Sequence, residues 1–271
     1  MQVEARGFTF DVVVGGPEDG QPVLLLHGFP QDHREFDLIA PRLHEKGLRT
    51  YAYDQRGYAP GARPAEVGAY RLSEPTRDAV AVLNALGLAS AHVVGHDWGA
   101  HVGWRLAAEH ADRVRTLTAI SVPHPRALGL ALRSRPTQRL RFAYMAVFRS
   151  PVAERLLLAG DGRALRQMMS PIGDRARLYA DAMAEPGRLT GGLNWYRALS
   201  RDELGVVGPI EVPTTYVWTD KDPVVRLTAA LRTADWVRAD YQLVAIKGVG
   251  HWVPEEAPRA LSDAVLARVG V

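Results

Sequence analysis

Short runs of apolar residues alternate along the chain with segments in which apolar residues recur every three or four positions. Such runs are typical of buried strands, and the longer periodic segments are typical of helices. Strands are predicted at residues 8–14, 22–28, 50–54, 91–96, 114–121, 214–219 and 241–246, and helices at 73–86 and 98–110. The turn residues GGPEDG predict a tight loop between the first two strands. This alternation favours the α/β class, with a mostly parallel sheet flanked by helices.

The segment from residue 124 to residue 208 interrupts this alternation. Its length of about 85 residues is too great for an unstructured connection inside a compact domain, so it should fold as a separate piece. Helix-like runs within it, such as 153–160 and 177–183, favour a helical fold. We therefore predict a core domain made of residues 1–123 and 209–271, with an inserted helical cap, or lid, at 124–208.

Composition and charge narrow the class of protein. The chain of 271 residues is 47% hydrophobic, enough for a substantial core, and it contains no cysteine for disulfides or thiolate chemistry. The net charge of +3 is small and the two signs are interspersed, so no nucleic-acid partner is expected. No apolar run approaches the ~18 residues of a membrane span, and the first residues do not resemble a signal peptide. We expect a cytoplasmic monomer or homodimer whose partner is a small molecule.

Candidate chemistry begins at residues 95–99, GHDWG, which have the G-x-nucleophile-x-G outline of a sharp turn from a strand into a helix. Asp97 stands where a serine would be expected. Asp222 follows the predicted strand at 214–219, and His251 follows the last predicted strand. Nucleophile, acid and histidine therefore occur in an order that is known from hydrolases. Each residue alone is a weak signal, but the combination is specific.

An aspartate at the nucleophile position favours attack on a saturated carbon. Its carboxyl group, with an unperturbed pKa of about 3.9, is ionised at neutral pH and needs no base to become nucleophilic. Displacement at carbon leaves an alkyl ester on Asp97, which an activated water must then hydrolyse. His251 is the predicted base for that water, oriented by Asp222.

The chain resembles the epoxide hydrolase branch of the α/β-hydrolase superfamily over essentially its whole length. The matching core motifs are HGFP (27–30), DQRG (54–57), GHDWG (95–99), DKDPVV (220–225) and GHW (250–252), and the matching cap segments are FAY (142–144) and GLNWYRA (192–198). The resemblance implies an α/β-hydrolase fold with a helical cap. It also implies an enzyme without a cofactor that opens an epoxide to a vicinal diol.

The resemblance assigns further roles to individual residues. Tyr144 and Tyr196 of the cap would donate hydrogen bonds or a proton to the epoxide oxygen, and the motif around Tyr196 is the more specific match. The backbone N–H groups of Phe29 and Trp98 would stabilise the oxyanion that forms during ester hydrolysis. Phe29, Trp98 and Trp195 are predicted pocket walls, together with Pro30, which would also hold the oxyanion loop in shape.

Alternatives remain for the acid and for the reaction. Asp220 competes with Asp222 for the triad, but Asp222 matches the family pattern and precedes Pro223. A haloalkane dehalogenase could use the same triad, with Trp98 as one halide donor, yet Phe29 has no side-chain donor to serve as the second. A fluoroacetate-type dehalogenase would be expected to have an arginine at the position of Trp98. A third alternative is a receptor of this fold that binds a small molecule without catalysis.

The remaining charged and titratable residues have ordinary interpretations. His27 and His96 are expected to brace loops, and no metal site is predicted because the other histidines lack ligand spacing: His33, His44, His92, His101, His110 and His124. Residues 124–200 contain 13 arginines against 5 acidic residues. Such charge is usually a solvated helical face, and a second hypothesis is that it steers an anionic substrate towards the site.

Overall fold

A computed structural model describes residues 1–134, 136–200 and 202–271; Arg135, one of the cap arginines counted above, lies outside the described residues. Its described part contains one eight-stranded sheet with the order β1-β2-β4-β3-β5-β6-β7-β8. The strands are β1 (Gln2–Ala5), β2 (Phe8–Gly15), β3 (Gln21–Leu26), β4 (Leu48–Tyr53), β5 (Ala91–His96), β6 (Val114–Ile120), β7 (Thr214–Thr219) and β8 (Tyr241–Ile246). The β1–β2 and β2–β4 pairs are antiparallel, and the pairs from β4 to β8 are parallel. The predicted α/β class is confirmed.

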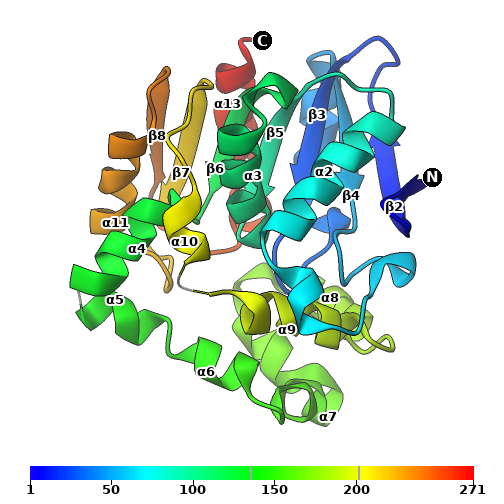
Figure 1. The fold of residues 1–271 in the computed structure, drawn as a ribbon, viewed down its shortest axis with the longest axis vertical. Helices are drawn as coiled ribbons and strands as arrows, with labels where there is room; N and C mark the ends of the chain where they lie inside the picture. The colour runs from blue at the N-terminus through cyan, green and yellow to red at the C-terminus, as the bar shows by residue number, and fades with distance from the viewer. Residues whose placement is uncertain (135, 201) are drawn as a thin grey trace.

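Helices cover both faces of the sheet because successive side chains of each buried strand point to opposite faces. In β3, Leu24 and Leu26 pack into the cluster that contains residues of α2 and α3, whereas Val23 and Leu25 pack towards α1 and α13. Figure 1 shows α2 and α3 on the near face of the sheet. The core helices are α1 (Ala40–Glu45), α2 (Ser73–Ala85), α3 (Trp98–Glu109), α11 (Leu227–Leu231), α12 (Val253–Glu256) and α13 (Pro258–Val269).

Seven further helices lie between β6 and β7 in the described sequence. They are α4 (Pro125–Ser134), α5 (Pro136–Arg141), α6 (Tyr144–Arg149), α7 (Ala153–Met168), α8 (Arg175–Met183), α9 (Arg188–Ala198) and α10 (Glu203–Val206). In Figure 1, α5 to α9 gather at one end of the sheet, whereas α4 lies beside α11 and the core. The insertion therefore faces the same end of the sheet at which β5, β7 and β8 finish.

Most of the predicted elements match the structure. The helices predicted at 73–86 and 98–110 are α2 and α3, and each predicted strand overlaps an observed one. Two features differ from the sequence analysis. The strand β1 was not predicted, and β2 and β3, although joined by a short loop, are separated in the sheet by β4. No described helix is both long enough and apolar enough to cross a membrane.

Candidate active site

Asp97 occupies a tight turn between β5 and α3. Its backbone has φ of 50° and ψ of −115°, a conformation that is uncommon for a residue with a side chain and that is found at strained functional turns. The turn brings α3 very close to β3, because a Cβ atom built on Gly99 would lie 1.9 Å from the carbonyl oxygen of Leu26. Glycine at this position is therefore required by packing.

The three predicted triad residues meet at the carboxyl ends of β5, β7 and β8, where open α/β sheets bind their ligands. Nδ1 of His251 lies 3.0 Å from Oδ2 of Asp222, and Nε2 of His251 lies 3.5 Å from Oδ2 of Asp97. Asp222 is buried, and its Oδ1 accepts hydrogen bonds from the N–H groups of Val224 at 2.6 Å and Val225 at 3.3 Å. The carboxylate is thus held in the orientation that faces the histidine.

Asp220 lies outside this arrangement. Its side chain is exposed, and Oδ1 accepts a hydrogen bond from the N–H of Gly248 at 2.6 Å. The structure therefore places Asp222, and not Asp220, beside His251.

Electrostatic interactions among the three groups favour their charged forms. Burial lowers the pKa of His251, but the carboxylates of Asp222 and Asp97 outweigh burial and raise the pKa to about 10. Burial raises the pKa of Asp97, but the hydrogen bond and charge of His251 outweigh it and lower the pKa to about 2. At neutral pH, Asp97 is a carboxylate and His251 is an imidazolium between two negative charges.

The HGFP loop supports one oxygen of Asp97. The N–H of Phe29 donates a hydrogen bond to Oδ1 of Asp97 at 3.0 Å. The N–H of Trp98 is the first of α3, so it has no acceptor within that helix. A Cβ atom on Gly28 would lie 2.4 Å from Cβ of Asp97, which shows how closely the loop approaches Asp97.

A cavity of about 580 Å³ is lined by Asp97 and by residues of the segment predicted to form the cap. Tyr144 and Tyr196 both line it, with ring centroids 6.2 Å apart. Burial raises the pKa of each tyrosine, and the charge of Asp97 adds to this effect. Both phenols are therefore protonated at neutral pH and available as hydrogen-bond donors.

Only part of the predicted pocket wall lines this cavity. Trp98 does so, whereas Phe29, Pro30 and Trp195 are not among the residues that face it. The Trp195 indole lies behind Trp98, with ring centroids 5.6 Å apart, and its Nε1 donates to the carbonyl of Arg56 at 2.9 Å. The Phe29 ring packs against Tyr196 at 5.3 Å between centroids. Phe29 and Trp195 thus pack behind residues that line the cavity, Tyr196 and Trp98.

Two buried residues, His96 and Glu35, lie next to the loop that carries His251. Nε2 of His96 lies 2.9 Å from the carbonyl oxygen of His251, and Nδ1 of His96 lies 3.2 Å from Oε2 of Glu35. Burial lowers the pKa of His96 to about 4, so its ring is uncharged at neutral pH, and burial raises the pKa of Glu35 well above its usual range. Glu35 could not be predicted from the sequence, because no motif marks it and only tertiary packing brings it to His96.

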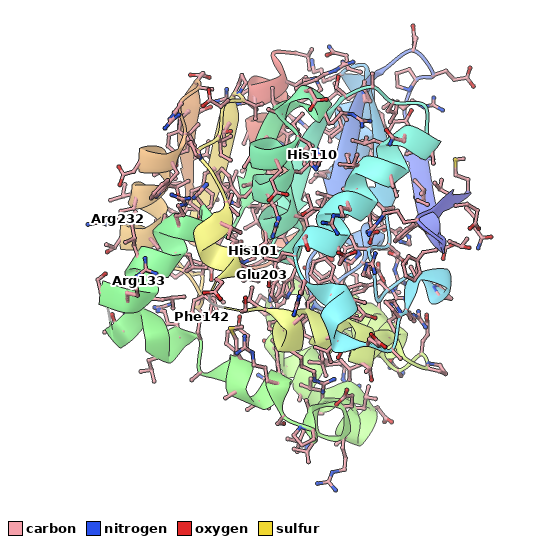
Figure 2. The ribbon with its side chains drawn as sticks, viewed as in Figure 1. His101, His110, Arg133, Phe142, Glu203 and Arg232 are labelled. Atoms are coloured by element: carbon pink, nitrogen blue, oxygen red, sulfur yellow. The ribbon has the colours of Figure 1, made fainter. Side chains whose placement is uncertain are left out.

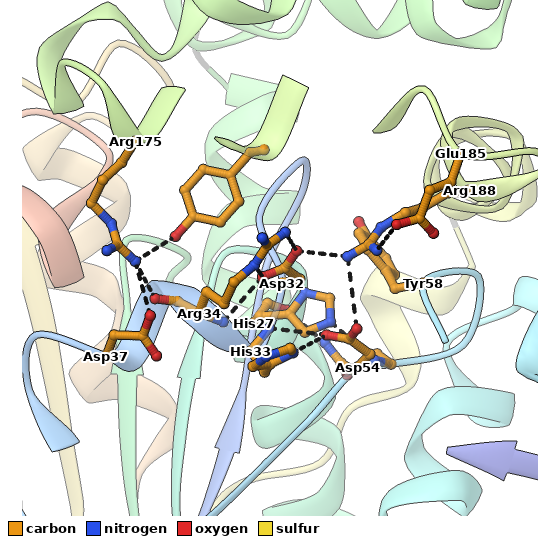
Figure 3. Close-up of polar contacts among 12 residues, drawn as sticks. His27, Asp32, His33, Arg34, Asp37, Asp54, Tyr58, Arg175, Glu185 and Arg188 are labelled. Atoms are coloured by element: carbon orange, nitrogen blue, oxygen red, sulfur yellow. Dashed lines mark hydrogen bonds and ion pairs between the residues drawn. The ribbon is translucent and has the colours of Figure 1, made fainter. Parts of the chain in front are cut away.

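One described group has the spacing of a metal site: Asp32, His33 and Asp54 place ligand atoms within 4.8 Å of one another. Arginines already supply positive charge there, since Asp32 pairs with Arg34 at 2.5 Å and with Arg188 of α9 at 2.6 Å. His33 lies 2.8 Å from Asp54. Figure 3 shows these contacts joining the cap helix to the core loop. We interpret the group as an anchor of the cap.

Comparison with known proteins adds independent evidence. A family model described as "alpha/beta hydrolase fold" matches residues 21–258. The chain is 33% identical to "Epoxide hydrolase A" of Mycobacterium tuberculosis, over 97% of this chain and 95% of that protein. It is 31% identical to "AB hydrolase superfamily protein YfhM" of Bacillus subtilis, with the same coverage.

Solved structures resemble the chain over its full length. Epoxide Hydrolase A from Mycobacterium thermoresistibile has a TM-score of 0.88 at 28% identity, covering 100% of this chain and 97% of that one. An epoxide hydrolase of Bacillus megaterium, in complex with an inhibitor, has a TM-score of 0.91 at 22% identity, covering 100% of both chains. The second likeness supports the fold alone.

Proposed function

The chain belongs to the α/β-hydrolase family, and from this premise we propose that it is an enzyme that hydrolyses epoxides to vicinal diols through an ester on Asp97. One observation carries the proposal. The Asp97 carboxylate faces a cavity that is also lined by the two protonated tyrosines, Tyr144 and Tyr196. A nucleophile for carbon and donors for an oxygen leaving group thus share one space, which is what epoxide opening requires.

In the first step, a carboxylate oxygen of Asp97 attacks one epoxide carbon and the C–O bond of the ring breaks. Oδ1 is held by the N–H of Phe29, so Oδ2 is the oxygen better placed to attack. The electron pair of the broken bond passes to the epoxide oxygen. Tyr144 or Tyr196 gives that oxygen a proton, which the tyrosine later regains from solvent.

Ester formation changes the state of His251. Asp97 loses its negative charge when it becomes an ester, and that charge is one of the two that raise the pKa of His251. The pKa of His251 therefore falls, the imidazolium gives its proton to solvent, and neutral Nε2 becomes a base. The histidine acquires its catalytic form only after the nucleophile has reacted.

In the second step, His251 takes a proton from water as the water oxygen attacks Cγ of Asp97. Negative charge develops on Oδ1, where the N–H of Phe29 already donates a hydrogen bond and the N–H of Trp98 can donate a second. The intermediate then collapses, and His251 gives its proton to the departing diol oxygen. Asp97 is returned as a carboxylate.

Haloalkane dehalogenation is the second candidate because the same triad would serve it and Trp98 lines the cavity. The Trp98 indole offers a halide one N–H donor, but the phenyl ring of Phe29 offers none. The two tyrosines have no necessary role in that reaction, since a halide leaves without a proton. These differences favour the epoxide.

The deciding experiment is intact-mass measurement of the His251→Gln variant after incubation with a mixed panel of epoxides and haloalkanes. Without the base, the first step proceeds and the ester accumulates. We expect a hydroxyalkyl adduct on the peptide that contains Asp97, and no adduct in the Asp97→Ala/His251→Gln double variant. A plain alkyl adduct would assign the protein to the dehalogenases. A panel member that stabilises the wild-type protein, yet forms no adduct and is recovered unchanged, would indicate a binding protein.

A further inference from the structure

His101 is a cavity residue that the mechanism above does not use. It lies one helical turn beyond Asp97 on α3, and its backbone N–H donates to the carbonyl of Asp97 at 3.3 Å. The side chain lines the cavity and is 7% exposed. Figure 2 shows it between α3 and the cap, on the side of the core that faces Phe142.

The surroundings of His101 leave its ring without a polar partner. One face of the imidazole lies against the Trp98 indole, with centroids 5.3 Å apart and an angle of 39° between the rings. The cavity wall nearby includes the apolar side chains of Val122 and Leu128. Nδ1 is enclosed and has no hydrogen-bond partner within the described part of the chain, whereas Nε2 is not fully buried and is the ring nitrogen that a molecule in the cavity can reach.

An unsatisfied histidine at this position is unusual because buried polar groups are nearly always hydrogen-bonded. Burial lowers the pKa of His101 to about 4, although the charge of Asp97 acts in the opposite direction. At neutral pH the ring is therefore uncharged, with one nitrogen as a donor and the other as an acceptor. A hydroxyl group, which both donates and accepts, is the simplest partner for such a ring.

Two other polar groups of the cavity do not compete for this role. The Arg149 guanidinium already donates to the carbonyls of Tyr196 at 2.7 Å and Leu199 at 2.8 Å. Ser200 is exposed. The Trp98 indole also lines the cavity with a buried Nε1 that has no acceptor among the described residues, but an indole N–H can only donate. Apart from the triad and the cap tyrosines, His101 is thus the buried side chain of the described cavity wall that can both donate and accept.

We propose that His101 determines substrate specificity by hydrogen-bonding a hydroxyl group of the substrate, so that the preferred substrates are epoxides that also carry an alcohol. This inference rests on the proposed epoxide hydrolysis. It adds to it the chemical class of the substrate and a residue that selects it.

The test compares two matched substrates: a short epoxide with a hydroxyl at the far end of its chain, and the same molecule with a methyl group instead. Wild-type protein should show kcat/KM about tenfold higher for the alcohol, because the analogue leaves the imidazole unpaired. His101→Phe keeps a ring against Trp98 and removes both nitrogens. It should lower kcat/KM for the alcohol about tenfold, chiefly through KM, and change the methyl analogue less than about twofold.

Two further variants separate hydrogen bonding from packing. His101→Asn loses the ring but keeps a donor and an acceptor, so it should retain most of the preference for the alcohol. His110→Phe makes the same chemical change at the far end of the same helix (Figure 2) and should leave both substrates unaffected. Equal losses for both substrates in His101→Phe, or no preference in the wild type, would overturn the proposal.

Binding measurements test the hydroxyl site separately from the proposed epoxide hydrolysis. If the protein opens neither epoxide, the saturated alcohol and its methyl analogue are compared by their dissociation constants. Tighter binding of the alcohol, lost in His101→Phe and kept in His101→Asn, would retain the hydroxyl site while rejecting epoxide hydrolysis. Equal binding of the two ligands would reject the hydroxyl site itself.

Discussion

The core side and the cap side of the cavity hold their polar groups in different ways. On the core side, hydrogen bonds orient the groups: His251 is bound by Asp222, and Asp222 is in turn fixed by the N–H of Val224. On the cap side, Tyr144 and Tyr196 are placed by ring packing against Phe148, with centroids 5.1 and 4.9 Å away. Hydrogen bonds set direction, whereas packing mainly fills space, so the two sides should respond differently to substitution.

The largest effect is expected for the core acid. Asp222→Ala removes the partner that orients His251, and we predict a fall in the rate of diol formation of about 10³- to 10⁴-fold. Asp220→Ala is the matched control, because that carboxylate is exposed and its one hydrogen bond to the described residues comes from the N–H of Gly248. The rate of this variant should differ from wild type by less than about twofold. Steady-state kinetics decide the matter, with thermal unfolding as a check on folding. Comparable losses in both variants would contradict the observed arrangement.

Acid pH should separate the two steps of the reaction on the core side. Asp97, with its pKa lowered to about 2, stays ionised at pH 5, so alkylation continues. His251 must be neutral to activate water, and below its pKa in the ester each pH unit cuts the neutral fraction about tenfold. Lowering the pH by two units within this range should slow ester hydrolysis about 100-fold, so the alkyl-enzyme should accumulate. Single-turnover mass measurements at several pH values test this.

The protonation of Tyr144 and Tyr196 should not change over the same pH range, because their raised pKa values keep both phenols protonated. If the rates of alkylation and of ester hydrolysis fell in parallel as the pH is lowered, the titrating group would be one other than His251. A constant ratio of alkyl-enzyme to free enzyme from pH 5 to pH 9 would likewise contradict the role of His251.

A smaller effect is expected when one cap hydroxyl is removed. Tyr144→Phe and Tyr196→Phe each leave the other phenol in the cavity, so each should lower epoxide opening only about 10- to 100-fold. The double variant should lose more than either single one. Thermal unfolding should change little, because ring packing is kept. Haloalkane turnover that survives the double substitution, with no diol formed, would favour the alternative function.

The sequence predicted the core side better than the cap side for a physical reason. Periodicity depends on local burial, so strands such as β5 and helices such as α3 were predicted close to their observed bounds. A short motif also predicted the turn at Asp97, because that turn needs small neighbours such as Gly99 within a few residues. Local rules were sufficient for both.

Features set by long-range packing were not predicted. Strand order requires knowing that β4 inserts between β2 and β3, which the tight loop between them does not reveal. The residues that line the pocket also depend on long-range packing. The motif around Trp195 matched the family, but its indole donates to the carbonyl of Arg56 and lies behind Trp98, away from the cavity wall. His101 carried no motif at all, and only the cavity made it notable.

The smallest effect is predicted for salt, and it concerns the positive charge of the cap. Arg175 and Arg188 pair with the core carboxylates of Glu255 and Asp32, which lie outside the cap segment, so part of the cap's excess charge is already neutralised. Raising salt from 0.05 to 0.5 M should therefore change kcat/KM for an epoxy acid, relative to a neutral epoxide, by about twofold or less. A selective fall much larger than this for the acid would mean that the cap does steer anions, and that its charge acts on substrate rather than only on the core.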